Sequence, residues 1–380
     1  MDSKKVITAA NHLTNDLVVE ILSRVLFKTF CRIKCVCKAW LAFPFDPHYN
    51  RKLPKIPTGV LCKGHNGSSI QVVNMSPDDK KIDGTLRFIP HHEQLQVVDC
   101  SNGLVLCRYK SFYTFGNTCR FIVCNPATQE WRALPVSNTN NHPYVSNYSR
   151  CTTFLTFDPS WSPQFYVFNF LQNAKGRPMG IRKLEVFSSE LFTWLVDDAW
   201  SSDHRLRFKN PHSFVGGVLH VQTNKTNEIL VVQGLEAMSS AVVPCHYIIR
   251  PPENCLGGCF GQSLGVLQWA CPEESGHVIK IFHLDAYRPC KWSLKHRLRI
   301  RDAFERDDFV PIEEYLQWLC DFEIVALDFE RGVIFLFEKY EKKLLWYNIN
   351  TGKLNEIKDD RFTHGCEYYS YVACYSKLPA

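Results

Sequence analysis

The chain has 380 residues, of which 45% are hydrophobic and 22% are charged, and its formal net charge at pH 7 is +6. These values are typical of a globular protein, and so small a positive charge does not by itself indicate nucleic-acid binding. No apolar run approaches the length of a membrane span, so we expect neither a membrane nor a nucleic acid as partner. The length allows one small module and one large domain, or two medium domains.

The cysteines indicate a reducing compartment. There are 17 of them, an odd number, and no two have the C-x-x-C spacing of a redox or zinc motif. The stretch from Met1 to His12 carries two lysines but no apolar core, so it predicts no signal peptide. We therefore expect the protein in the cytoplasm, the nucleus or both.

The N-terminal segment predicts short amphipathic helices. Apolar residues recur at helical spacing in two groups, which are Leu13, Leu17, Ile21, Leu22 and Val25, and then Ile33, Val36, Cys37 and Trp40. Thr14 or Asn15 is placed to cap the first helix, and Thr29 the second. Helices this small cannot bury both apolar faces against each other, so the surplus apolar surface indicates a docking element.

This segment resembles an F-box. The residues that carry the resemblance are Leu13, Ile21-Leu22-Ser23-Arg24 and Val36-Cys37-Lys38-Ala39-Trp40, in the family's order and spacing. The resemblance implies a small three-helix module that binds a Skp-type adaptor and, through it, a cullin. It assigns adaptor contact to Leu13, Leu17, Ile21, Leu22, Val36, Cys37 and Trp40, some of which must also hold the helices together. Thr14 and Leu26 depart from the family, which usually has proline at both positions.

Four prolines mark the end of this module. Pro44, Pro47, Pro54 and Pro57 stop helices and stiffen a connector. We therefore expect a flexible N-terminus over residues 1–10, an F-box over 11–52, a linker over 53–60 and one large domain over 61–375.

The large domain is predicted to be antiparallel and all-β. Short apolar segments separated by turn residues replace the helical period, for example Leu104–Leu106, Phe121–Val123, Phe165–Phe168, Leu184–Phe187, Gly217–Val221, Ile229–Val232, Gly265–Trp269, His277–Ile281, Val333–Phe337 and Leu344–Tyr347. Weak repetition of a turn followed by an aromatic residue favours a β-propeller, of roughly seven blades at 40–50 residues each. A large β-sandwich is the alternative. Because a propeller closes on itself, we expect the segment Tyr368–Tyr375 to pair near Val60-Leu61-Cys62.

The same region resembles the F-box-associated, kelch-like domain of plant F-box proteins. The motifs that carry this resemblance are Asp99–Leu106, Phe121–Pro135, Phe157-Asp158-Pro159 and Glu185–Ser189. The order of the two modules matches that family as well.

One motif favours a different class of protein. Gly261-Gln262-Ser263-Leu264-Gly265 fits the G-x-S-x-G nucleophile elbow of serine hydrolases, and Asp285 or Asp302 and then His364 follow in the hydrolase order. The elbow requires a helix directly after the serine, but the residues from Val266 to Ala270 predict a strand. A hairpin between two strands is therefore the expected structure, and we expect no catalytic residue.

Metal binding and a basic stretch are the remaining candidates. Cys255 and Cys259 have no histidine at ligand spacing, and His91-His92 is an isolated pair, so no metal or other cofactor is expected. The stretch Lys291–Arg301 is the most basic. As a strand it places Arg297, Arg299 and Arg301 on one face and points Leu298 and Ile300 to the core. This face is either solvated or meets an anionic patch on a partner protein.

The resemblance implies a substrate receptor of an SCF ubiquitin ligase, whose β domain binds a target protein that the sequence does not identify. Two alternatives stay open. One is a serine hydrolase that uses Ser263, and the other is an adaptor protein outside any ligase, which the departures at Thr14 and Leu26 allow.

Overall fold

The computed structural model describes residues 14–25, 40, 58–63, 70–74, 82–109, 121–136, 149–159, 161–173, 180–197, 200, 202–206, 212–225, 227–235, 244–252, 258–263, 265–273, 278–300, 304, 312–314, 317–319, 322–328, 332–338, 341–357, 367–374 and 377–379. The chain divides into two compact units, Met1–Pro57 and Thr58–Ala380. Within the described residues, no helix has both the length and the apolar character needed to cross a membrane.

The first unit contains the helix α1 (Asn15–Ser23). Thr14 is its N-cap, because its side-chain oxygen accepts a hydrogen bond from the Leu17 N–H at 3.4 Å, as the sequence predicted. Asp16 in the first turn suits the positive end of the helix dipole. Trp40 is also helical, whereas the expected cap Thr29 and the rest of the three-helix module lie outside the described residues.

Among the described residues, the second unit consists mainly of strands, with a short 3-10 helix η3 (His92–Gln94) before the third strand. The strands are β1 (Thr58–Lys63), β2 (Ile70–Asn74), β3 (Leu95–Ser101), β4 (Leu104–Tyr109), β5 (Phe121–Asn125), β6 (Glu130–Ala133), β7 (Ser149–Phe157), β8 (Phe165–Asn173), β9 (Gly180–Ser188), β10 (Thr193–Asp197), β11 (His212–Val215), β12 (Val218–Gln222), β13 (Ile229–Gln233), β14 (Cys245–Ile249), β15 (Cys259–Ser263), β16 (Val266–Pro272), β17 (Val278–Tyr287), β18 (Cys290–Arg299), β19 (Ile312–Glu314), β20 (Gln317–Leu319), β21 (Phe322–Asp328), β22 (Val333–Glu338), β23 (Lys343–Asn348), β24 (Lys353–Ile357) and β25 (Glu367–Val372).

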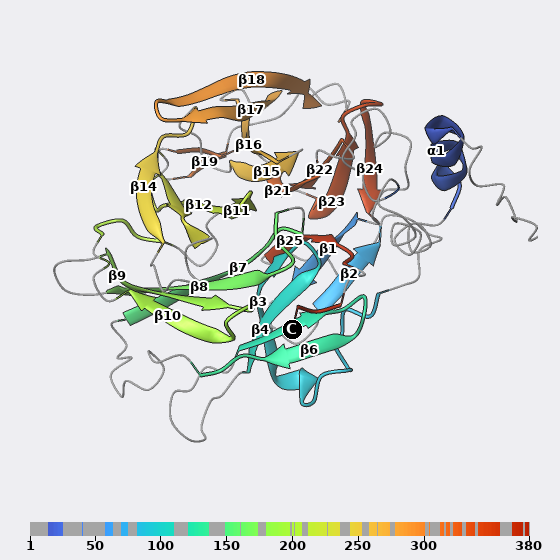
Figure 1. The fold of residues 1–380 in the computed structure, drawn as a ribbon. Helices are drawn as coiled ribbons and strands as arrows, with labels where there is room; N and C mark the ends of the chain where they lie inside the picture. The colour runs from blue at the N-terminus through green and yellow to red at the C-terminus, as the bar shows by residue number, and fades with distance from the viewer. Residues whose placement is uncertain are drawn as a thin grey trace, which may run out of the picture. The chain divides into compact units, whose positions relative to one another are not determined.

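These strands form a β-propeller (Figure 1). Five sheets have four strands each in simple chain order, β3 to β6, β7 to β10, β11 to β14, β15 to β18 and β21 to β24, and a sixth has the order β2-β1-β25. The first strands β3, β7, β11, β15 and β21 and the strand β25 contact one another in turn around a ring. The ring rules out the two stacked layers of a sandwich. Within the described residues it contains five four-stranded blades and one closing sheet, fewer than the roughly seven blades expected from a 40–50-residue repeat.

The two ends of this unit close the ring. β25 pairs antiparallel with β1, with Val60 opposite Ser370 and Leu61 opposite Tyr369. The expected pairing of the C-terminal segment with Val60-Leu61-Cys62 is thus confirmed. Closure means that this sixth sheet takes strands from both ends of the unit, so β1 is paired on both of its edges, with β2 and with β25.

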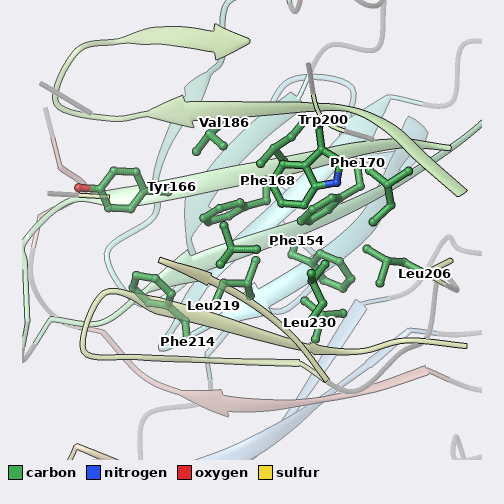
Figure 2. Packing of buried hydrophobic residues seen from close by; sticks show 14 of the residues in the cluster. Phe154, Tyr166, Phe168, Phe170, Val186, Trp200, Leu206, Phe214, Leu219 and Leu230 are labelled. Atoms are coloured by element: carbon green, nitrogen blue, oxygen red, sulfur yellow. The ribbon is translucent and has the colours of Figure 1, made fainter. Parts of the chain in front are cut away.

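The core lies between neighbouring blades. Figure 2 shows one such cluster, in which Phe154, Phe168 and Phe170 from one blade face Phe214 and Leu219 from the next. Phe154 and Phe170 meet edge to face at 6.0 Å between ring centroids. Both faces of a blade are covered in this way, so a strand within the sheet such as β5 is buried at every position.

Candidate functional site

The helix α1 has two apolar faces with different exposure. Val18, Val19 and Leu22 are buried, and Leu22 is only 2% exposed. Leu17 and Ile21 are 51% and 53% exposed, and at a spacing of four residues they are neighbours on one face. Among the described residues, Leu22 therefore lies on the buried side of α1, whereas Leu17 and Ile21 form an exposed apolar face.

The other residues expected to contact the adaptor are only partly described. Trp40 is half-buried. Leu13, Val36 and Cys37 lie outside the described residues. Glu20 and Arg24 lie beside the exposed pair and form an ion pair with each other at 2.7 Å.

The segment around Ser263 is a hairpin. Ser263 ends β15 and pairs with Val266 at the start of β16, and Gly265 between them has φ +73°, a turn conformation that favours glycine. A strand, not a helix, therefore follows the serine, so no helix N-terminus is directed at a developing oxyanion. Asp285 lies on β17, where it accepts a hydrogen bond from the Ser293 hydroxyl at 2.9 Å. Asp302 and His364 lie outside the described residues.

No metal-binding group is formed among the described residues, since no three His, Cys, Asp or Glu side chains lie together. Burial raises the pKa of Cys259 to about 12, so this group is a neutral thiol and a poor ligand. His91 and His92 lie near Glu93 on an exposed turn. Cys255 lies outside the described residues.

Three of the four motifs that carry the family resemblance link separate sheets of the ring. Asp99, at the end of β3, accepts a hydrogen bond from the Leu155 N–H of β7 at 2.7 Å, and it lies 3.0 Å from Nε2 of His212 on β11. Two residues later, the Ser101 hydroxyl accepts from the Phe157 N–H at 3.1 Å. These contacts tie three successive inner strands, so the motif that begins at Asp99 holds the ring together.

Two of the other three motifs also link separate sheets, whereas Glu185–Ser189 bonds within its own blade, for example through the Phe165 N–H that donates to the Ser189 hydroxyl. Asp158 accepts from the Gly216 N–H at 3.1 Å and so links β7 to the turn between β11 and β12. The Asn125 side chain donates to the carbonyl of Cys374 at 2.8 Å, and the Glu130 carboxylate accepts from the Leu378 N–H at 2.6 Å. The chain end beyond β25 is thus fastened to the turn between β5 and β6. Sequence reasoning identified these residues as a family signature but did not predict what they contact.

A polar pair of a buried histidine and a partly buried tyrosine also joins two blades. His220 on β12 is fully buried, and its Nε2 lies 2.8 Å from the Tyr287 hydroxyl at the end of β17. Burial lowers the pKa of His220 to about 4 and raises that of Tyr287 to about 12, so both groups are neutral near pH 7. No sequence signal identified this pair, because an isolated histidine in a strand carries no information about its partner.

The basic stretch forms β18, which lies at the outside of its blade. Arg297 and Arg299 are exposed, whereas Leu298 and Ile300 are buried, as the alternation predicted. Arg301 lies outside the described residues. The strand therefore presents a row of cations to solvent while it fastens the blade through its apolar side chains.

Comparison with protein families assigns both parts of the chain. A family described as "F-box protein At3g26010-like, beta-propeller" matches residues 79–378, and the F-box domain matches residues 11–49.

Curated proteins of Arabidopsis thaliana are similar to this chain. F-box protein At5g07610 is 27% identical over 196 residues, which cover 47% of this chain and 44% of that protein. F-box protein At5g49610 is 27% identical over 217 residues, which cover 54% and 57%. F-box/LRR-repeat/kelch-repeat protein At2g27520 is 24% identical over 236 residues, which cover 61% and 60%. The chain spans about half the length of the curated relatives that it matches first.

Among solved structures, a chain of the nidogen/laminin complex is similar, with 11% identity and a TM-score of 0.44 over 83% of this chain and 98% of that one. A periplasmic gluconolactonase of Pseudomonas aeruginosa is 10% identical, with a TM-score of 0.39 over 84% of this chain and all of that one.

Proposed function

Since the chain belongs to the family of F-box proteins with an At3g26010-like β-propeller, we propose that it is the substrate receptor of an SCF ubiquitin ligase. Its F-box binds a Skp-type adaptor, and through it a cullin, while the propeller binds a target protein. The observation that carries the proposal is the exposed pair Leu17 and Ile21 on α1, which lies inside the matched F-box segment.

The two units have separate tasks in this proposal. The F-box spans residues 11–52 as a three-helix module, residues 53–60 connect it, and residues 61–375 form the F-box-associated propeller of the kelch-like kind. The protein works in the cytoplasm, the nucleus or both. The support is its odd number of cysteines, because an odd number does not fit the paired disulfides of a secreted domain.

The mechanism is tethering. Holding the target in the same complex as the ubiquitin-conjugating enzyme raises the effective concentration of the target's lysines near the activated ubiquitin. A correctly placed bound reactant removes part of the entropic cost of the bimolecular encounter. The chain contributes position and needs no nucleophile, general base or metal of its own.

Adaptor contact centres on the exposed face of α1. Leu17 and Ile21 each expose about half of their side chain, and covering apolar area contributes roughly 25 cal/mol per Å². Leu13, Val36, Cys37 and Trp40 remain proposed contacts from the F-box resemblance. Leu22 is assigned to the packing of the module, because it is already buried without a partner.

Binding of the full chain to a purified Skp-type adaptor tests the proposal. The double variant Leu17→Ser/Ile21→Ser should weaken adaptor binding by about 2–3 kcal/mol, or roughly 30- to 150-fold, because both substitutions remove apolar area from the contact. A matched control is Val136→Ser/Leu191→Ser, since both residues are similarly exposed but lie on the propeller. Its affinity for the adaptor should match that of the unmodified chain.

The outcomes separate the candidate functions. No adaptor binding by the unmodified chain at micromolar concentration would contradict the ligase proposal and favour an interaction protein outside a ligase, the alternative raised by Thr14 and Leu26. Equal binding by the α1 variant and its control would leave the adaptor contact elsewhere on the chain.

A further inference from the structure

The outermost strand of one blade differs from the others in length. β18 has ten residues, whereas the outermost strands β6, β10, β14 and β24 have four or five. Within the described residues it pairs only with β17, so its other edge carries backbone N–H and C=O groups that no neighbouring strand takes up. A long free edge of this kind is the element that an extended peptide can join by strand addition.

The β17–β18 hairpin also holds most of the protein's net charge. Its residues 278–299 contain six Lys and Arg side chains against one Asp, a net charge of +5, compared with +6 for the whole chain. Four of these cations are on β18 and are exposed, namely Lys291, Lys295, Arg297 and Arg299. Leu294, 46% exposed, lies among them and offers apolar contact at the same edge.

The chain itself binds a carboxylate at this row. Glu273 accepts a hydrogen bond from Arg297 at 2.8 Å and lies 3.2 Å from Nζ of Lys280, which is directly opposite Arg297 on β17. Within the described residues, no carboxylate forms an ion pair with Lys291, Lys295 or Arg299. Lys291, Lys295 and Arg299 of the free edge strand are therefore available to the carboxylates of a partner.

Charged side chains on an edge strand commonly prevent association with a second copy of the same edge. The cations of β18 have this effect, because two copies of β18 paired edge to edge would place cations opposite cations. The same repulsion makes the edge selective, since a strand that carries carboxylates meets no such penalty.

We propose that β18 is a docking edge for an extended, acidic segment of the target protein, with carboxylates at alternate positions. Arg297 and Arg299 lie two residues apart on one face, about 7 Å in a strand, which is the spacing of alternate side chains on a paired strand. Lys295 extends the row at a β-bulge, where it has no opposite residue on β17. Arginine pairs with carboxylates through two parallel hydrogen bonds, which adds geometric selectivity.

This inference deepens the proposed function by naming the chemistry of the target segment. It rests on the proposed function only in taking the bound protein to be the target of the ligase. A nucleic acid fits the edge less well, because it cannot pair with the backbone groups of a strand and needs a broader basic surface. The carboxylates that follow β18 in the sequence, Asp302, Glu305, Asp307 and Asp308, lie outside the described residues and enter the test as competitors.

Fluorescence anisotropy with the full chain tests the proposal. The probe is a labelled twelve-residue peptide of alternating Glu and Thr. The variant Lys295→Gln/Arg297→Gln/Arg299→Gln should bind it about tenfold more weakly or worse, a loss of about 1.4 kcal/mol. The matched control Arg87→Gln/Lys342→Gln/Lys353→Gln removes the same charge from exposed positions elsewhere, and its affinity should stay within about twofold. Alternate N-methylation of the peptide should also weaken binding, because it removes the N–H groups that join the edge.

Four results would overturn the inference. The first is equal weakening in both triple variants, and the second is equal binding of a peptide with its Glu residues in one block, since either reduces the effect to bulk charge. The third is tighter binding of a single-stranded oligouridylate with the same dependence on Lys295, Arg297 and Arg299. The fourth is peptide binding that appears only when Asp302, Glu305, Asp307 and Asp308 are replaced by their amides. That result would mean that this acidic segment of the chain itself occupies the edge of β18.

The adaptor assay keeps the two proposals apart. The β18 triple variant should bind the Skp-type adaptor as well as the unmodified chain does. Loss of peptide binding with adaptor binding intact concerns the docking edge alone, whereas absence of adaptor binding in the unmodified chain concerns the ligase role alone.

Discussion

Substitution of Asn125 by alanine should destabilise the propeller through a residue 249 positions away. Asn125 is fully buried in the turn between β5 and β6. Its side-chain amide donates to the carbonyl of Cys374 at 2.8 Å, and its side-chain oxygen accepts from the Ala127 N–H at 3.0 Å. Alanine keeps neither bond, so the partly buried Ala127 N–H and Cys374 carbonyl each lose this hydrogen bond.

The two lost bonds set the size of the effect. A fully buried polar group that loses its hydrogen bond costs about 1–3 kcal/mol, and because Ala127 and Cys374 are only partly buried, Asn125→Ala should lower the free energy of unfolding by about 2–4 kcal/mol. At about 2 °C per kcal/mol for a large domain, the melting temperature should fall by about 4–8 °C. Thr128→Ala in the same turn is the control, because Thr128 is half-exposed and its bond to Glu130 is 3.2 Å long. It should cost less than about 0.5 kcal/mol.

A double-mutant cycle, measured by urea unfolding, tests the mechanism. In a chain cut after Val372 the Cys374 carbonyl is already gone, so Asn125→Ala should cost about half as much there as in the full chain. The difference is the coupling between the turn and the chain end, and groups in direct contact show about 0.5–3 kcal/mol. The same cost in both backgrounds would refute the reasoning, because Asn125 would then act only within its own turn.

Three further predictions concern closure, pH and chemistry. Cutting the chain before Tyr368 removes most of β25 and opens the edge of β1, so the product should aggregate or melt well below the intact protein; equal solubility and melting temperature would contradict closure by this strand. The folded pKa of His220 is about 4 against 6.5 unfolded, so its stabilising contribution is complete above pH 6.5 and is lost as the pH falls toward 4. The loss is on the order of 3 kcal/mol, and His220→Gln should flatten the stability profile over that interval; an unchanged profile would refute this. A covalent serine-hydrolase probe should not label the folded protein, and labelling that disappears in Ser263→Ala would restore the hydrolase reading.

Local signals in the sequence were sufficient for the elements. Helical spacing and a capping residue located α1, and Thr14 caps it as predicted. Short apolar runs between turn residues located strands such as β5, β9 and β22, because the period of two and the conformational freedom of glycine and asparagine at turns act over a few residues. The hairpin after Ser263 was predictable for the same reason, since it depends on the residues from Val266 to Ala270 alone.

Only the tertiary structure assigned roles to particular side chains. Leu17 and Leu22 fit the same helical pattern, yet one is exposed and the other buried, because burial depends on what packs against each face. The repeat length suggested roughly seven blades but did not determine their number, and the described residues form five four-stranded blades and one closing sheet, since a repeat length does not specify how many sheets close a ring. Asp99, Asn125 and His220 find partners 56, 249 and 67 residues away. The sequence determined which segments are strands and which family they resemble, but a contact between distant segments forms only when the ring closes and brings their backbones together.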